Sequence, residues 1–287
     1  MNYTTLISTQ ELAKHLDDPN WAVLDCRFDL ANPSWGQTQY LKSHLPGAIY
    51  AHLDHDLSAP VIPGKTGRHP LPSIEDLRRT FSRFGIDKRV QVVAYDNYPE
   101  KAVTSAARLW WLLRWLGHPA VAVLDGGWQA WQAESRPVIT GEEKRTRRSF
   151  VPDPHPQMLA SVQEVNAWRT NPAYRLVDSR SANRFRGENE TIDPVAGHIP
   201  GAISAPFAEN YGLDGRFLTV RSLKARFQLL LGNTPPEKAV FYCGSGVTAV
   251  CNLLAFTHAG MGEARLYAGS WSEWITDPNR PVATGDI

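Results

Sequence analysis

Short apolar runs alternate along the chain with segments of helical periodicity. Val90–Tyr95 and Val121–Leu124 are predominantly apolar runs of the length typical of buried strands. Between them, the segment Lys101–Leu116 places apolar side chains at helical spacing, namely Ala106, Leu109, Trp110, Leu113 and Leu116. This alternation predicts an α/β fold in which helices flank a mostly parallel central sheet. In such sheets, ligands bind beyond the carboxyl ends of the strands.

The chain repeats this pattern once. A capping-box sequence at Ser8–Glu11 recurs at Ser161–Glu164, with a hydroxyl at the N-cap and a carboxylate three positions later. The other matching pairs are Val23–Arg27 with Leu176–Arg180, His44–Ile49 with His198–Ile203, and Gly126–Trp131 with Gly269–Trp274. Since order and spacing both persist, we interpret the chain as one domain in tandem duplicate.

The two copies are expected at residues 1–140 and 158–287, separated by a linker at 141–157. The linker holds a charged run, Glu142–Arg148, followed by prolines at alternate positions, Pro152, Pro154 and Pro156. Alternating prolines favour an extended, rather stiff connector. The basic residues indicate either a solvated linker or a docking patch.

Composition narrows the class of protein. The chain has 287 residues, a formal net charge of +1 and 43% hydrophobic residues. A near-zero charge gives no reason to expect nucleic acid or an anionic membrane as partner. No basic segment followed by an apolar one marks the N-terminus as a signal peptide, and no apolar run approaches the ~18 residues of a membrane span. Three cysteines without regular spacing do not form a disulfide framework, so we expect a reducing cytoplasm.

Cys243 is the main candidate for chemistry. The apolar run Val240–Tyr242 ends at Cys243, the glycines Gly244 and Gly246 follow, and a helix is expected over Val247–Ala259. The glycines allow several N–H groups to turn toward one point, and the helix directs its positive end at the sulfur. Such surroundings favour a thiolate nucleophile or a persulfide. The alternative is a small buried hydrophobe beside an ordinary turn.

The other candidate positions differ from Cys243. In the first copy, Asp96 occupies the equivalent place, and a carboxylate cannot act as a sulfur nucleophile. The first copy is therefore expected to be catalytically inactive while building one wall of a cleft between the domains. Cys26 and Cys251 lack glycine-rich surroundings and are interpreted as packing residues.

The chain resembles the two-domain rhodanese-fold sulfurtransferases, and within them the 3-mercaptopyruvate sulfurtransferase class. The resemblance covers almost the whole chain and rests on four sets of residues: the loop Cys243–Thr248, both His-x-Pro-Gly-Ala turns, Arg184–Gly187 and Tyr267–Trp274. Thiosulfate-using relatives carry cations just after the loop cysteine, whereas Gly244 and Ser245 are uncharged. That difference favours the mercaptopyruvate class.

The resemblance implies a reaction and a binding site. Cys243 would attack the donor sulfur and become a persulfide while pyruvate leaves, and the outer sulfur would pass to cyanide or to a thiol such as thioredoxin or a small thiol. No metal or cofactor is implied. Arg184 would bind the donor carboxylate, and the loop residues Gly244, Gly246, Val247 and Thr248 would complete the substrate site.

Two further features of the family bear on the site. A second arginine is usual before the His198 turn, but the stretch 188–196 contains none, which implies weaker or altered donor specificity. The family also places Ser, His and Asp near one another, which here would be Ser245, His69 and Asp54. Together they would polarise the donor carbonyl and help protonate the departing enolate. The alternative is that Asp54 and His69 are ordinary loop residues, and Arg186 is expected to have an exposed structural role.

Other functions remain open at this stage. Thiosulfate sulfurtransferase, releasing sulfite, is the nearest enzymatic alternative. A cysteine phosphatase would need a loop closed by an arginine, and residues 243–249 contain no Arg or Lys. A persulfide carrier without turnover is the non-enzymatic alternative.

Overall fold

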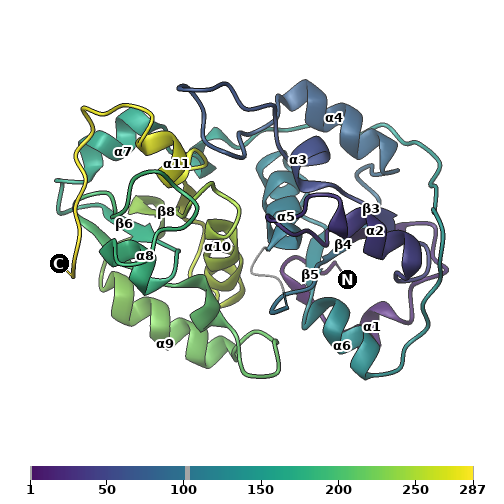
Figure 1. The fold of residues 1–287 in the computed structure, drawn as a ribbon. Helices are drawn as coiled ribbons and strands as arrows, with labels where there is room; N and C mark the ends of the chain where they lie inside the picture. The colour runs from purple at the N-terminus through teal and green to yellow at the C-terminus, as the bar shows by residue number, and fades with distance from the viewer. Residues whose placement is uncertain (1, 101–103, 287) are drawn as a thin grey trace. The chain divides into compact units, whose positions relative to one another are not determined.

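The computed structural model describes residues 2–100 and 104–286 of the chain (Figure 1). The described residues form two compact units. The first comprises the described parts of 1–59, 71–155 and 213–217, and the second comprises 60–70, 156–212 and the described part of 218–287. The segment 60–70 therefore packs with the second unit although it comes from the first half of the sequence.

The first unit is built on a parallel sheet with the strand order β1-β5-β4-β2-β3. Its strands are β1 (Leu6–Ile7), β2 (Trp21–Asp25), β3 (Ile49–Tyr50), β4 (Gln91–Tyr95) and β5 (Val121–Leu124). Its helices are α1 (Thr9–Leu12), α2 (Trp35–Lys42), α3 (Leu53–Asp56), α4 (Ile74–Arg83), α5 (Ser105–Trp115) and α6 (Gly127–Ala133).

Helices cover both faces of this sheet. Val93 and Tyr95 of β4 point into a core shared with Trp128 and Trp131 of α6. Helix α5 packs against β4 and β5, and its side chains are almost all buried. Because both faces are covered, the strands read as continuous apolar runs rather than as alternating ones.

The second unit repeats this architecture with the strand order β7-β6-β8-β9, again parallel. Its strands are β6 (Arg175–Asp178), β7 (Ala202–Ser204), β8 (Ala239–Tyr242) and β9 (Arg265–Leu266). Its α-helices are α7 (Val162–Trp168), α8 (Ala182–Arg186), α9 (Val220–Leu231), α10 (Ala249–His258) and α11 (Ser270–Trp274), with short 3₁₀ helices at Pro156–Met158, Phe207–Asn210 and Pro236–Lys238.

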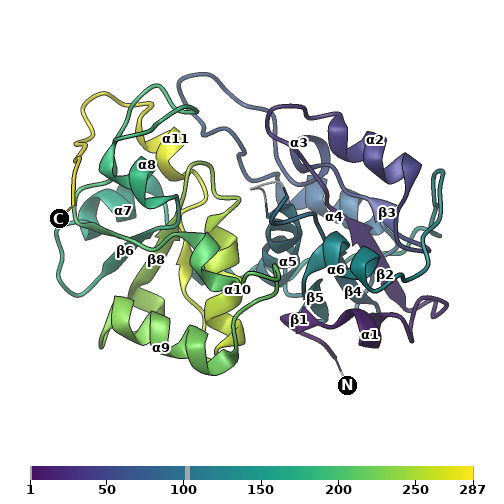
Figure 2. The ribbon, with the colours of Figure 1, turned by 60° about the horizontal axis from the view of Figure 1, so that its bottom comes forward.

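In the second unit, α7, α8 and α11 lie on one face of the sheet, and α9 and α10 lie on the other (Figures 1 and 2). The first face buries Trp271 and Trp274 against Tyr242 of β8. The second face is held by ring contacts of Phe241 with Phe227 and Phe256.

The predicted α/β fold with parallel sheets is confirmed, and the predicted strand Val121–Leu124 matches β5. The helix predicted over Lys101–Leu116 corresponds to α5, and its first three residues lie outside the described part of the chain. The Ser161 capping box forms in full. At Ser8, the hydroxyl accepts from the Glu11 amide, while the Glu11 carboxylate bonds to Lys14. None of the described helices is long and apolar enough to cross a membrane.

Candidate active site

Cys243 follows β8 directly, at the carboxyl end of the second sheet. Its side chain is 1% exposed, and the Gly246 amide donates to its sulfur at 3.2 Å. The backbone of Cys243 is fixed by α11, since its amide donates to Ser270 Oγ at 3.1 Å and its carbonyl accepts from the Trp271 amide at 2.9 Å. A sulfur that accepts from a backbone amide is in surroundings that favour a negative charge.

Gly246 determines the shape of the loop. Its φ is +74°, and a Cβ at this position would lie 2.3 Å from the carbonyl oxygen of Ala268. Only glycine suits that combination of dihedral and crowding. The same turn delays the helix, so α10 begins at Ala249 and not at Val247 as predicted. Val247 and Thr248 therefore belong to the loop, as does Gly244.

Ser245 and His69 lie together in the second unit. His69 Nδ1 is 2.7 Å from Ser245 Oγ, and both side chains are buried. His69 belongs to the segment 60–70, which joins the second unit at α11, because the Arg68 amide donates to Ser272 Oγ at 3.0 Å. Gly67 permits this approach, since a Cβ there would lie 2.6 Å from the Gly269 carbonyl oxygen.

Asp54 has a different position in the chain. It lies on α3 of the first unit, where its amide donates to His52 Nδ1 at 3.1 Å. The structure thus brings two of the three predicted triad members together in one unit. The part of Asp54 in that triad stays a prediction.

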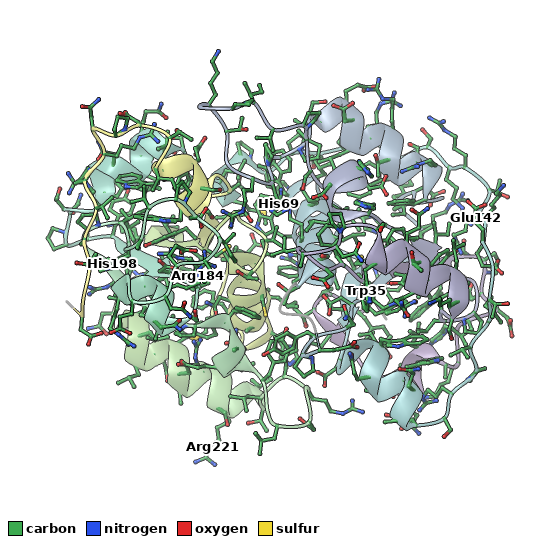
Figure 3. The ribbon with its side chains drawn as sticks, viewed as in Figure 1. Trp35, His69, Glu142, Arg184, His198 and Arg221 are labelled. Carbon is green, nitrogen blue, oxygen red and sulfur yellow. The ribbon has the colours of Figure 1, made fainter. Side chains whose placement is uncertain are left out.

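Arg184, on α8, is held by two carboxylates of the stretch that lacks a second arginine. Its Nε and Nη2 donate to Glu190 at 2.9 and 2.8 Å, and Nη2 also donates to Asp193 Oδ2 at 2.9 Å. Its guanidinium is directed at the loop, since both Nη atoms lie 3.7 Å from the place of a Cβ on Gly244. Figure 3 labels Arg184 and His69, which come from α8 and from the segment 60–70.

Three charged residues next to the loop, Arg68, Glu190 and Asp193, were not predicted from the sequence. Arg68 is paired with Asp193 Oδ1 and lies next to Gly244. Its position beside His69 was the available signal, and Glu190 and Asp193 stood in a stretch considered only for its lack of arginine.

Burial and charge act in opposite directions on these two carboxyl groups. Burial raises the pKa of Asp193, and the nearby Arg68 and Arg184 offset only part of that rise. Burial also disfavours the charge of Glu190, but the amides of Asp193 and Ile192 and the Arg184 guanidinium outweigh it, so the pKa of Glu190 is lowered.

The remaining candidates fit their structural interpretations. All three cysteines are free and buried. Burial raises the pKa of the Cys26 thiol well above its usual range, which disfavours a thiolate there. Cys251 lies inside α10, with its sulfur 3.0 Å from Tyr211 Oη. Arg186 pairs at the surface with Glu188.

Comparison with known proteins bears on this geometry. The family description "Rhodanese-like domain" matches residues 8–134 and 161–277, which together make up most of the chain. The chain belongs to the rhodanese family. Both matched segments contain one copy of the internal repeat, and the second contains the Cys243 loop.

Full-length relatives extend the comparison. A Pseudomonas aeruginosa protein named "Probable 3-mercaptopyruvate sulfurtransferase" is 49% identical over 287 residues, covering 100% of both chains. An Escherichia coli 3-mercaptopyruvate sulfurtransferase is 30% identical over 98% of this chain and 99% of its own. A Mycobacterium tuberculosis protein that carries a thiosulfate sulfurtransferase name is 38% identical over 98% of this chain and 97% of its own.

Solved structures show the same tandem rhodanese fold. The 3-mercaptopyruvate sulfurtransferase from Leishmania major superposes with a TM-score of 0.81 at 31% identity, over 94% of this chain and 74% of that one. The Escherichia coli enzyme superposes with a TM-score of 0.79 at 29% identity, over 94% of this chain and 100% of its own.

Proposed function

We propose that the protein is a 3-mercaptopyruvate sulfurtransferase with Cys243 as its nucleophile. The observation that carries this proposal is the buried Cys243 sulfur, which accepts from the Gly246 amide in a loop whose Ser245 is in hydrogen-bond contact with His69. The names of full-length relatives support the donor.

The reaction divides into two transfers. The Cys243 thiolate attacks the donor sulfur, the carbon–sulfur bond breaks, and its electron pair leaves on carbon as the enolate of pyruvate. The enolate then takes up a proton to give pyruvate, and Cys243 is left as a persulfide. A thiol, such as thioredoxin or a small thiol, or cyanide attacks the outer sulfur and restores the Cys243 thiolate.

His69 and Ser245 are suited to the proton step. A serine hydroxyl in contact with an imidazole can hydrogen-bond the donor carbonyl, and the imidazole can supply or hold the proton that the enolate needs. Asp54 is the proposed third member, which would orient the imidazole. Arg184 is proposed to bind the donor carboxylate, and the backbone of Gly244, Gly246, Val247 and Thr248 to surround the sulfur.

Because Cys243 must be reduced to react, we also propose a reducing compartment, the cytoplasm, which the free state of all three cysteines supports. Neither nucleic acid nor a membrane is a proposed partner.

Thiosulfate is the second candidate donor. The name of the Mycobacterium tuberculosis relative favours it, while the uncharged residues Gly244 and Ser245 disfavour a dianion. The test compares kcat/KM for the two donors on the purified protein, with pyruvate and sulfite measured directly. We expect a preference for 3-mercaptopyruvate, and a preference for thiosulfate would refute the proposal. Loading of Cys243 without repeated release of pyruvate would identify a carrier instead.

A further inference from the structure

The linker between the two copies packs along the first unit. Residues 142–155 form neither helix nor strand and belong to that unit. Arg145 donates to the Trp21 carbonyl, at the amino end of β2, at 2.7 Å. The Arg148 amide donates to the Ser82 carbonyl, in the last turn of α4, at 3.1 Å. An irregular basic segment thus covers the surface between the start of β2 and the end of α4.

The corresponding surface of the second unit is uncovered in the described part of the chain. Helices α4 and α9 are each followed closely by a glycine with positive φ, Gly85 at +71° and Gly232 at +55°. A Cβ on Gly85 would lie 2.8 Å from the carbonyl oxygen of Thr146 in the linker, whereas a Cβ on Gly232 would have no atom within 4 Å. Leu229, in the last turn of α9, is 87% exposed. The second unit therefore presents to solvent the surface that the linker covers in the first.

This surface forms a groove with a volume of about 500 Å³. Its walls include the last turn of α9, Pro172 and Pro235. The described residues that line it hold two cations, Arg175 and Lys238, and no carboxylate. Neither cation forms an ion pair with a described residue, and the Nε of Arg175 is buried without a hydrogen-bond partner there. We call it the α9 groove, lined by residues 172, 173, 175, 229–235 and 238.

Charge distinguishes the α9 groove from the surface under the linker. In the first unit the cations belong to the linker, and Arg148 pairs with Asp87 of the surface beneath it. In the second unit the cations belong to the groove, so a segment that fills it must carry the opposite charge. Carboxylates would satisfy Arg175 and Lys238, and apolar side chains would bury Leu229. The last carbonyls of a helix lack intrahelical partners, so those of α9 can accept from backbone amides of the segment.

We propose that the α9 groove is a docking site for an extended acidic segment of a partner protein. The segment would lie on the second unit as the linker lies on the first, with its charge reversed. The groove is at the amino ends of β6 and β8, whereas Cys243 follows the carboxyl end of β8. The partner and the sulfur donor would therefore bind at opposite ends of the sheet, and the proposal is independent of the proposed function.

The first test compares two peptides of the linker segment 144–151 as probes of the full chain. One has the natural basic sequence, and the other has glutamate in place of Lys144, Arg145, Arg147 and Arg148. In calorimetric titrations we expect the acidic peptide to bind about tenfold or more tightly than the natural one, because only its charge complements the groove. Raised salt should weaken its binding. If neither peptide binds, or if both bind equally, the proposal is wrong.

The second test locates the bound peptide. Lys238→Ala should weaken the Kd of the acidic peptide about tenfold, since one charge-assisted contact is lost. Leu229→Ser should also weaken it, while the salt dependence stays. Arg221→Ala is the matched control, because it removes an exposed guanidinium from the start of the same helix (Figure 3) and should leave the Kd unchanged. Thermal unfolding midpoints equal to the wild type would show that the variants are folded. An unchanged Kd in both groove variants would overturn the assignment.

Two other occupants give different results. If a second copy of this chain fills the groove, sedimentation of the wild type should show a dimer that Lys238→Ala dissociates, and this outcome would overturn the proposal. If the cations serve phosphate groups, a single-stranded oligonucleotide of equal charge should displace the acidic peptide, which would also overturn it. We expect no dimer that depends on Lys238 and no displacement.

Discussion

The ends of strands β4 and β8 show how one scaffold supports two different residues. Next to the end of β4, Asp25 of the neighbouring strand β2 accepts from Arg27 and, at 2.6 Å, from Tyr95. Arg27 also donates to the Ser43 carbonyl. Next to the end of β8, Arg180 makes the corresponding bonds: it donates to Asp178 of the neighbouring strand β6 and to the Gly197 carbonyl, each at 2.6 Å. The guanidinium groups of the two arginines lie over equivalent tryptophan rings, Arg27 over Trp128 and Arg180 over Trp271. The scaffold is thus common to both units and does not itself select the chemistry.

The difference begins at the next residue. Asp96 and Cys243 occupy the same backbone position, since the carbonyl of each accepts at 2.9 Å from the matching tryptophan amide. The Asp96 carboxylate accepts from the amides of Tyr98 and Ala106. In the first unit, the backbone amides after the strand are therefore bound by a side-chain carboxylate of the protein itself. At Cys243 the loop amide of Gly246 instead reaches a sulfur. The two units therefore differ in the loop after the strand and not in the sheet beneath it, and we attribute the proposed persulfide chemistry of the second unit to that loop.

The largest expected effect tests this point at both strand ends. Cys243→Ser should abolish turnover without unfolding the protein, because the hydroxyl cannot accept the donor sulfur. Asp96→Cys should acquire no persulfide when incubated with 3-mercaptopyruvate, since its loop lacks the matching glycines. Mass spectrometry of intact protein and of peptides measures both results.

The control for this test is Cys251→Ser, which makes the same change within α10 and should retain turnover. A persulfide found on Cys26 or Cys251, or one formed on the thiol introduced by Asp96→Cys, would contradict the role assigned to the loop.

The second prediction concerns the pair Ser245 and His69. His69→Ala should slow pyruvate release by roughly 10²–10⁴-fold, the usual worth of general acid–base help. The loss should be smaller with thiosulfate, because sulfite leaves without needing a proton on carbon. His69→Ala/Ser245→Ala should lose little more than the worse single variant, since residues that act as a unit are not additive. Single-turnover release of pyruvate and sulfite gives these rates.

Asp54→Ala extends the same cycle to the proposed third member. If Asp54 orients His69, the variant should lose most of the same advantage, and adding it to His69→Ala should cost little more. Strictly multiplicative losses, or equal losses with both donors, would show that these residues act separately.

The fold and the family could be predicted from the sequence, whereas the ion pairs around the site could not. Strands and helices followed from local periodicity, and the duplication from matching motifs, because both depend on residues near in sequence. The pairing of Arg68 with Asp193 joins residues 125 positions apart and depends on the segment 60–70 packing with the second unit. No local pattern contains that information. The later start of α10 had a local cause, the positive φ of Gly246, but its consequence for the helix depends on the crowding by Ala268.

The smallest predicted effect is the decrease in the free energy of unfolding that accompanies ionisation of the buried Asp96. Burial raises the pKa of Asp96 to about 6, and the amides of Ala106 and Tyr98 offset only part of that rise. Between the unfolded value of 3.8 and about 6, the folded state binds more protons than the unfolded state, so stability falls as pH rises. The full cost, about 3 kcal/mol from the difference of these two values, is present above pH 6 and absent below pH 4.

Asp96→Asn removes this titration, although the amide side chain can accept from only one of the two backbone donors. We therefore expect the stability of the wild type to fall more than that of the variant between pH 4 and pH 7, by up to about 3 kcal/mol. Urea unfolding at intervals of one pH unit measures the difference, and Asp17→Asn, at an exposed site of the same unit, controls for the loss of a charge. If the free energies of unfolding of wild type and Asp96→Asn changed in parallel with pH, ionisation of Asp96 would not destabilise the first unit. The two strand ends would then differ only in the nucleophile and not in the energy of the loop that holds it.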